Sequence, residues 1–179
     1  RVLLQGKVPE RTTITVEGQA APGAFAELVL ELTPDKSLPG SGPGASGGNF
    51  ILTHITATLG GKTLEFASAS ATHEQGGWPV AEALRLGAKD EGESGWAISG
   101  GTGRAQTARF KLKTPATVRP GDKLQVVLAC ENERWPSHVL GSFTLRTAGP
   151  APEVKEKPVA AGSTEAALAQ NRRAEIAYR

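Results

Sequence analysis

Residues 38–59 read LPGSGPGASGGNFILTHITATL, a glycine-rich run that leads directly into an apolar, β-branched segment. Five of the nine residues from Gly40 to Gly48 are glycine. Such a run loses too much backbone entropy to form a helix, and it makes a poor strand. We therefore interpret it as a shaped surface loop that feeds a core strand. That strand is predicted over Phe50–Leu59, with a bulge near Thr53 where its alternation slips.

The same alternation of apolar and polar side chains recurs on both sides of this stretch. It is clearest in Ala26–Leu32 and Ala105–Lys113, and such a period of two indicates a strand with one buried face. Further strands are predicted over Thr12–Val16, Thr63–Ser70, Trp96–Ser99, Leu124–Cys130 and Val139–Thr147. One or two helical turns are predicted over Val80–Leu86, behind Pro79.

The number of turn residues favours many short strands over long helices, with 22 glycines and 12 prolines in 179 residues. Together with the strand pattern, this predicts an all-β antiparallel sandwich of jelly-roll type. The core residues expected between its two sheets are Leu30, Ile55, Phe110, Leu128 and Phe143.

Charge and hydropathy exclude several kinds of partner. The net charge is only +2, and no basic stripe interleaved with aromatic residues is present, so nucleic acid is not expected. The apolar runs are too short to span a bilayer, so we expect no membrane insertion. The single cysteine, Cys130, can form no internal disulfide and is interpreted as a small buried hydrophobe.

The composition changes at Gly149 and divides the chain into three parts. Residues 1–148 form the predicted sandwich, and residues 149–162 read as a proline-rich, charged linker. Residues 163–179 are predicted to form a terminal helix, with Ser163 as its N-cap and a thin apolar face. The sequence contains no methionine and begins within strand-like residues, so we expect it to be a piece of a longer polypeptide.

Four motifs occur in a distinctive order, namely LPGSGPGASGGNFILT, SASATHEQGGWPVAEAL, SGWAIS and HVLGSFTL. In order and spacing, over about Ala24–Arg146, they resemble the galactose-binding-like (discoidin-type) module of large planctomycete-type secreted proteins, which also carry a cytochrome c-like domain. The resemblance implies a jelly-roll sandwich that binds carbohydrate beside neighbouring domains of the same parent chain. It also implies a periplasmic or extracellular location.

Modules of this type often bind a structural calcium ion through a loop that reads Asp-Gly-Asp-x-x-Thr-x-Trp. When this loop is aligned on Trp96, Glu91 and Ser94 take the second-acid and threonine positions, and Lys89 replaces the first aspartate. Lysine offers no oxygen ligand to a hard cation, so Asp90 would have to serve instead. The resemblance therefore implies a Ca²⁺ site at Asp90, Glu91 and Ser94, and a solvated acidic loop is the alternative.

No arrangement typical of an enzyme occurs in the sequence. His54, His73 and His138 lack metal-ligand spacing, and there is no G-x-S-x-G nucleophile motif. No pair of acidic residues stands out for glycosidic chemistry. The chain is therefore expected to be non-catalytic.

Sugar binding is the sharper hypothesis, because apolar sugar faces pack on aromatic planes while hydroxyl groups need polar partners. Trp96 is expected in the core, whereas Trp78 and Trp135 lie in polar loops and are the candidate platforms. The polar companions predicted for them are His73, Glu74, Arg104, Glu133 and Arg134. The alternative is a spacer or docking domain between catalytic or redox domains, with no ligand of its own.

Overall fold

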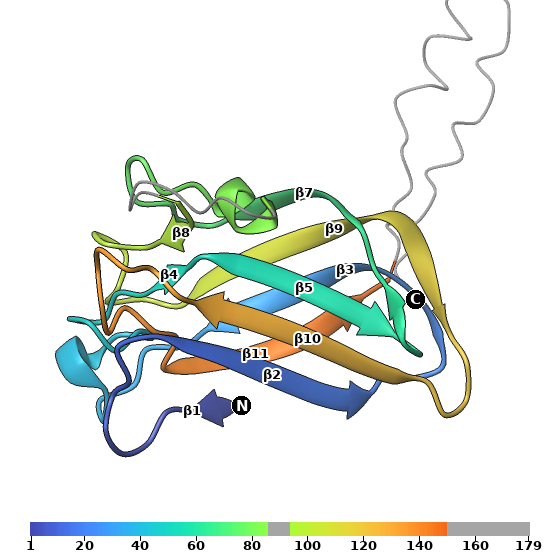
Figure 1. The fold of residues 1–179 in the computed structure, drawn as a ribbon, viewed down its shortest axis with the longest axis horizontal. Helices are drawn as coiled ribbons and strands as arrows, with labels where there is room; N and C mark the ends of the chain where they lie inside the picture. The colour runs from blue at the N-terminus through green and yellow to red at the C-terminus, as the bar shows by residue number, and fades with distance from the viewer. Residues whose placement is uncertain (86–93, 150–179) are drawn as a thin grey trace, which may run out of the picture.

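Two antiparallel sheets face each other in the protein, as Figure 1 shows for the computed structural model, which describes residues 1–85 and 94–149. In the larger sheet the strands follow the order β1 (Val2–Leu3), β11 (Ser142–Ala148), β3 (Gly23–Leu32), β9 (Gln106–Val118) and β7 (Phe66–Ala71). In the smaller sheet they follow the order β2 (Thr12–Gln19), β10 (Lys123–Cys130), β5 (His54–Leu59) and β6 (Lys62–Thr63). The predicted all-β antiparallel sandwich is thereby confirmed.

Four short elements complete the fold outside the two main sheets. The strands β4 (Ile51–Leu52) and β8 (Trp96–Ala97) pair with each other, and the 3₁₀ turns are η1 (Pro39–Ser41) and η2 (Val80–Leu84). The turn η2 falls where helical turns were predicted. The predicted linker beyond Gly149 and the predicted terminal helix lie outside the described residues.

One hydrophobic core fills the space between the two sheets. The strand β3 turns Leu28, Leu30 and Leu32 inward, and all three are 0% exposed because alternate residues of a strand point to the same face. The predicted core set lies in this single cluster, with Leu30, Ile55, Phe110, Leu128 and Phe143 all at 2% exposure or less. The sequence pattern therefore identified the core correctly.

Two predicted strands are divided in the structure. The segment predicted as Phe50–Leu59 breaks at Thr53, whose N–H and hydroxyl both donate to the carbonyl oxygen of Ala129, at 2.8 and 2.9 Å. The residues before the break pair with β8 and those after it pair with β10. The irregularity lies where the bulge was predicted, but it is a change of pairing partner.

The segment predicted as Thr63–Ser70 also changes sheet. The strand β6 ends at Thr63 in the smaller sheet, and the chain then crosses to the larger sheet as β7. The N–H of Leu64 donates to the carbonyl oxygen of Ala57 at 2.9 Å, which holds the crossing against β5. A continuous apolar alternation therefore spanned two strands of different sheets.

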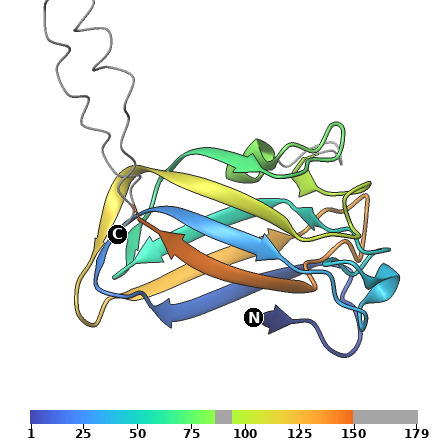
Figure 2. The same ribbon diagram turned by 180° about the vertical axis from the view of Figure 1, so that it is seen from behind.

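The connections differ between the two ends of the sandwich (Figures 1 and 2). Short turns at residues 20–22, 60–61 and 119–122 join strands at one end, which we call the turn end. At the other end, which we call the loop end, the longer segments 4–11, 33–50, 72–79, 98–105 and 131–141 lie together. The candidate ligand-binding residues all fall in or beside the loop end.

Candidate ligand-binding surface at the loop end

The glycine-rich loop is folded tightly on itself. The N–H of Gly44 donates to the carbonyl oxygen of Gly48 at 3.0 Å, and Ser46 and Asn49 exchange backbone hydrogen bonds. A β-carbon added at Gly44 would lie 2.1 Å from the carbonyl oxygen of Asn49, a distance that no side chain tolerates. The glycine content is therefore explained by the crossing of two backbone segments.

This loop also holds the segment that leads into β11. The carbonyl oxygen of Pro43 accepts hydrogen bonds from the N–H groups of Gly141 and Ser142, both at 2.9 Å. The N–H of Ala45 donates to the carbonyl oxygen of Val139 at 3.0 Å. The glycine-rich loop thus anchors one side of the 131–141 loop, which carries Trp135.

Trp78, one of the two predicted platforms, is buried instead. It is 8% exposed and packs with Ile51 and Ala97 in a small apolar cluster beside β4 and β8. The backbone N–H of Trp78 donates to the carbonyl oxygen of Gln75 at 2.9 Å, which closes the turn that points the ring inward. Trp78 cannot present a face to a ligand in this conformation, because apolar residues of the β4–β8 pair cover it.

The polar companions predicted around Trp78 support the local fold. His73 Nε2 lies 3.0 Å from the carbonyl oxygen of Ser99, and the His73 carbonyl accepts the indole N–H of Trp96 at 3.0 Å. Glu74 accepts the N–H of Val80 at 2.8 Å and so caps the start of η2. Trp96 itself is 0% exposed, as predicted for a core residue.

A pair of amides that the sequence reasoning missed organises the same region. Asn49 Oδ1 accepts the N–H of Ile98 at 2.9 Å, and Asn49 Nδ2 lies 3.2 Å from Gln75 Oε1. Gln75 Oε1 also accepts the N–H of Ser99 at 3.2 Å. These contacts join segments that are 24 to 49 residues apart in sequence, so no local pattern could have indicated them.

Trp135, the second predicted platform, is 46% exposed. The backbone N–H of Trp135 donates to Asn132 Oδ1 at 2.9 Å, a contact that fixes the turn below the ring. The Arg134 guanidinium carbon lies 5.9 Å from the Trp135 ring centroid, within the range of a cation–π contact. The His138 ring meets the indole edge-on at a centroid distance of 6.2 Å. The indole is thus both accessible and held by its neighbours.

An ion pair and a backbone hydrogen bond join the loop of Trp135 to segment 4–11. Glu133 forms an ion pair with Arg11 at 2.9 Å, and the Ser137 N–H donates to the Glu10 carbonyl oxygen at 2.7 Å. These contacts tie segment 4–11 to the 131–141 loop. We call Trp135, Arg134, Glu133, Arg11 and His138 the Trp135 surface. The sequence predicted three of its members and missed Arg11 and His138, which have no sequence motif that links them to the tryptophan.

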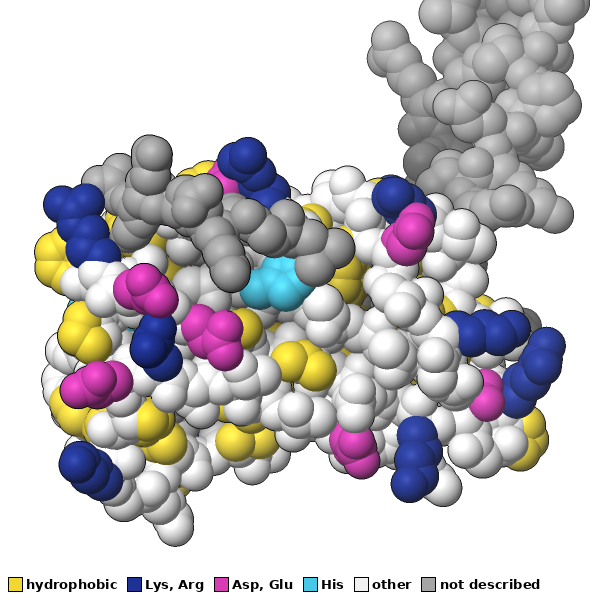
Figure 3. Space-filling view, in the orientation of Figure 1, with side chains coloured by type: hydrophobic (Ala, Val, Ile, Leu, Met, Phe, Trp, Pro, Cys, Tyr) yellow, Lys and Arg dark blue, Asp and Glu magenta, His cyan; other side chains and the backbone are white. Residues whose placement is uncertain are grey.

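Arg104, the remaining predicted ligand residue, is exposed in the turn before β9. It lies at the same end of the molecule as Trp135 but in a different loop, 98–105. Across the face formed by β2, β10 and β5, acidic and basic side chains are scattered without a patch of one sign (Figure 3).

The predicted calcium ligands are only partly described. Asp90 and Glu91 lie outside the described residues, so the calcium site stays a prediction. Ser94 is described, and its hydroxyl oxygen is shielded from solvent with no hydrogen-bond partner in the structure. Within residues 1–85 and 94–149, no group of three or more His, Cys, Asp or Glu side chains could hold a metal ion.

The single thiol lies in the core, as predicted. Cys130 is 2% exposed at the end of β10, and burial raises the pKa of its thiol to about 12. The reactive thiolate is therefore scarce at neutral pH.

In the described part of the chain, no helix has the length and apolar character needed to cross a bilayer.

Comparisons of the chain with protein-family models, with curated proteins and with solved structures gave no match.

Proposed function

We propose that this chain is a non-catalytic carbohydrate-binding module of a larger secreted protein, and that it binds sugar on the Trp135 surface. The observation that carries the proposal is the 46% exposure of Trp135, whose backbone and ring are both held by neighbouring residues. An exposed indole gives the apolar face of a sugar ring a plane to pack against. Because the indole is already ordered, binding costs little conformational entropy.

The polar rim of the Trp135 surface supports the same ligand class. The ion pair between Arg11 and Glu133 brings donors and acceptors to the tryptophan loop, which is what sugar hydroxyl groups require. Glu133 offsets the charge of Arg11, so the two arginines and one glutamate of this rim leave only a small net charge, and a neutral glycan fits better than a strongly charged one. The resemblance of the sequence motifs to galactose-binding-like modules points to the same class of ligand.

A second candidate is a spacer or docking domain between other domains of the parent chain. It is favoured by the number of loop-end side chains that serve the fold, such as His73 and Glu74. In this alternative Trp135 contacts a neighbouring domain and no glycan binds.

Calcium enters the proposal only as the resemblance implies it, with Asp90, Glu91 and Ser94 as the proposed ligands. The shielded, unpaired hydroxyl of Ser94 is compatible with an oxygen ligand. Calorimetric titration with Ca²⁺ tests this idea together with a thermal shift assay, and the absence of both heat and shift would remove it.

The test of sugar binding compares three variants on a glycan array and by affinity electrophoresis in plant and algal polysaccharides. Trp135→Ala should abolish retardation, and Trp135→Phe should keep part of it because an aromatic plane remains. Arg104→Ala is the matched control, since it alters an exposed loop-end residue outside the Trp135 surface and should bind like the wild type. Silence of the wild type across the whole panel would favour the spacer.

A further inference from the structure

A groove of about 450 Å³ lies at the turn end, away from the Trp135 surface. It forms where the chain leaves the smaller sheet at the end of β6 and joins the larger sheet at the start of β7. Three segments line it, namely the crossing at residues 62–65, residues 113–117 of β9, and the turn 119–122. Its volume falls in the range of small-molecule sites, which is about 300–1,000 Å³.

Hydrogen bonds between these segments fix the walls of the groove. The N–H of Lys113 donates to the carbonyl oxygen of Glu65 at 2.8 Å, which joins the crossing to β9. The N–H of Gly60 donates to the carbonyl oxygen of Lys123 at 3.0 Å, which joins the two turns at this end. The groove is therefore preformed, and a ligand would meet side chains on a fixed backbone.

Basic side chains outnumber acidic ones in the lining. Lys62, Lys113 and Arg119 are positively charged, against Glu65 and Asp122. Glu65 forms an ion pair with Lys113 at 3.0 Å, and Asp122 Oδ2 accepts the backbone N–H of Arg119 at 2.9 Å. The side chains of Lys62 and Arg119 are exposed and form no ion pair within the described residues. Figure 3 shows basic side chains that project from this end of the molecule.

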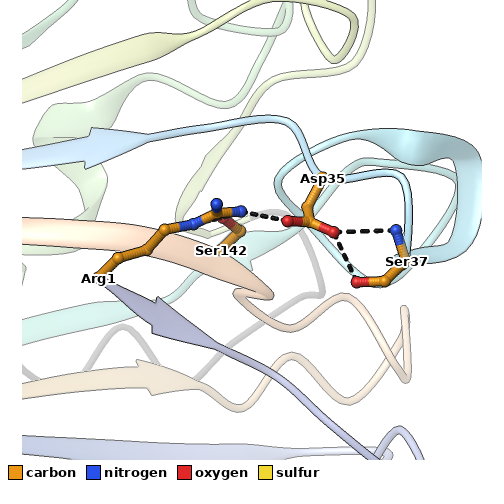
Figure 4. Close-up of polar contacts among 4 residues, drawn as sticks. All are labelled: Arg1, Asp35, Ser37 and Ser142. Carbon is orange, nitrogen blue, oxygen red and sulfur yellow. Dashed lines mark hydrogen bonds and ion pairs between the residues drawn. The ribbon is translucent and has the colours of Figure 1, made fainter.

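Arg119 differs in this respect from most arginines that the structure describes. Arg1 forms an ion pair with Asp35, which also accepts the N–H of Ser37 at 2.9 Å, and it donates to the hydroxyl of the buried Ser142 at 2.8 Å (Figure 4). Four further arginines form ion pairs with glutamates, and these are Arg11, Arg85, Arg109 and Arg146. The groove therefore has in its lining an arginine and a lysine that are both available to a ligand.

The uncharged part of the lining combines hydroxyl groups with a small apolar surface. Three exposed threonines and three buried or half-buried aliphatic residues contribute to it, namely Thr63, Thr114, Thr117, Leu59, Leu64 and Ala116. Threonine hydroxyls both donate and accept hydrogen bonds, as a ligand rich in hydroxyl groups requires. The apolar side chains give its C–H groups a surface to contact.

Two other kinds of anionic partner fit the groove less well. No aromatic side chain lines it, so nucleobases have no platform on which to stack. The large apolar side chains exposed in residues 1–85 and 94–149 are Val2 and Trp135, and neither lines the groove. It therefore offers no side chain that could insert into an anionic membrane. These observations favour a compact anion that also has hydroxyl groups.

We propose that the groove binds an acidic sugar residue of a polysaccharide, with Lys62 and Arg119 at its anionic group and the threonines at its hydroxyl groups. A guanidinium can donate two parallel hydrogen bonds to one anionic group, and lysine adds a point charge. A uronate carboxylate and a sulfate ester share this chemistry, and separate probes distinguish them. The site goes beyond the proposed neutral-glycan site and does not depend on it, because the two lie at opposite ends of the sandwich.

Affinity electrophoresis of the full chain tests the proposal with matched polysaccharides. The parent protein is Trp135→Ala, so that the Trp135 surface does not contribute. Gels contain polygalacturonate or its methyl ester, and dextran sulfate or dextran, so that each pair differs only in its anionic groups. The parent should be retarded by at least one acidic polymer and by neither neutral one. Retardation by polygalacturonate alone identifies a carboxylate, by dextran sulfate alone a sulfate ester, and by both a site that accepts either anion.

Two charge variants in the same background locate the site. Lys62→Ala combined with Arg119→Ala should weaken binding at least tenfold. The matched control combines Lys36→Ala with Arg104→Ala, which removes two exposed charges at the loop end, leaves the same net charge and should bind like the parent. All four side chains are exposed, so both variants should fold, and thermal denaturation checks this.

Nuclear magnetic resonance gives a readout that needs no variant. Trigalacturonate and isomaltotriose sulfate are added in turn to the ¹⁵N-labelled wild type. The sugar that matches the retarding polymer should shift the amide resonances of Thr117 and Arg119. Shifts confined to the loop end would overturn the proposal.

Other outcomes would also overturn it. Absence of retardation by both acidic polymers would remove the site, and equal weakening in the two charge variants would show that only the net charge matters. Retardation of the wild type that is lost in Trp135→Ala would assign the acidic glycan to the Trp135 surface. Tighter binding of oligothymidylate or of phosphatidylserine vesicles, lost in the Lys62 and Arg119 variant, would assign the groove to nucleic acid or to a membrane surface.

Discussion

The loops that carry Trp78 and Trp135 look alike in sequence but differ in structure. Both are polar, both lie at the loop end, and in each the tryptophan precedes a proline. Trp78 is 8% exposed against the apolar residues Ile51 and Ala97, whereas Trp135 is 46% exposed beside charged neighbours. The comparison teaches that a loop tryptophan is buried or presented according to which distant segment packs opposite it.

Removal of the buried indole should give the largest effect on stability. Trp78→Ala would leave a cavity between β4, β8 and the loop, and we expect it to lower the free energy of unfolding by about 3–5 kcal/mol. Urea denaturation followed by circular dichroism measures this change. A loss below about 1 kcal/mol would mean that the Trp78 loop is not part of the core.

The amide network behind the same loop should come next. Asn49→Ala leaves the N–H of the buried Ile98 without its acceptor, and an unpaired buried donor costs about 1–3 kcal/mol. Denaturation curves measure the loss. Asn49→Asp is the control. Its carboxylate still accepts the N–H of Ile98 and only the donor to Gln75 is lost, so Asn49→Asp should lose less stability than Asn49→Ala.

A pH effect is expected at His54, a residue of β5 that lies against Ala83 of η2. Burial lowers the pKa of His54, and the backbone of Ala83 opposes this shift only in part. No described residue gives either ring nitrogen a well-aligned hydrogen bond. The folded state therefore favours the neutral form of His54. At pH values above the pKa of an unfolded histidine, about 6.5, this residue causes no loss of protein stability. Stability falls as the pH drops below that value, because the unfolded chain takes up the proton more readily.

Thermal denaturation at pH 7.5 and pH 5.5 tests this prediction. The melting temperature of the wild type should fall more over this interval than that of His54→Gln, in which the side chain at position 54 does not titrate. Carboxylates contribute equally to both proteins, so the difference between them isolates His54. Identical falls in the two proteins would contradict the assigned shift.

The exposed indole should have the smallest effect on folding. Trp135→Ala removes a side chain that is 46% exposed and lies outside the core clusters, so we expect the free energy of unfolding to change by no more than about 1 kcal/mol. The same variant should lose sugar binding. In contrast to Trp78→Ala, it separates ligand recognition from folding, and a large loss of stability would contradict that separation.

The sequence was sufficient where one strand has one buried face. Alternation located β3 and β9, because a period of two is imposed by the pleat, and a mostly apolar run located β10. All five expected core residues lie in the core. The sequence was insufficient at Thr53 and Leu64, where continuous apolar segments change their pairing partner or their sheet. Such changes depend on distant strands: at Thr53 the slip in alternation marked the position but not the new pairing partner, and at Leu64 the alternation continues without a break.

The candidate site was predicted only in part for the same reason. Trp135, Arg134 and Glu133 were found because they are adjacent in the chain. Arg11 reaches them through an ion pair that spans 122 residues, and the burial of Trp78 depends on the β4–β8 pair. Residue type indicated which side chains could bind a sugar, but only the packing of distant segments decides which of them are accessible.

The position of Cys130 has a practical consequence. As the only cysteine of the chain, enclosed in the sheet with its pKa raised to about 12, it is protected from alkylating reagents while β10 keeps its neighbours. A chromogenic thiol reagent would therefore modify only those molecules in which the smaller sheet has transiently separated. The native protein thus contains its own kinetic reporter for the opening of the sandwich, without any added label.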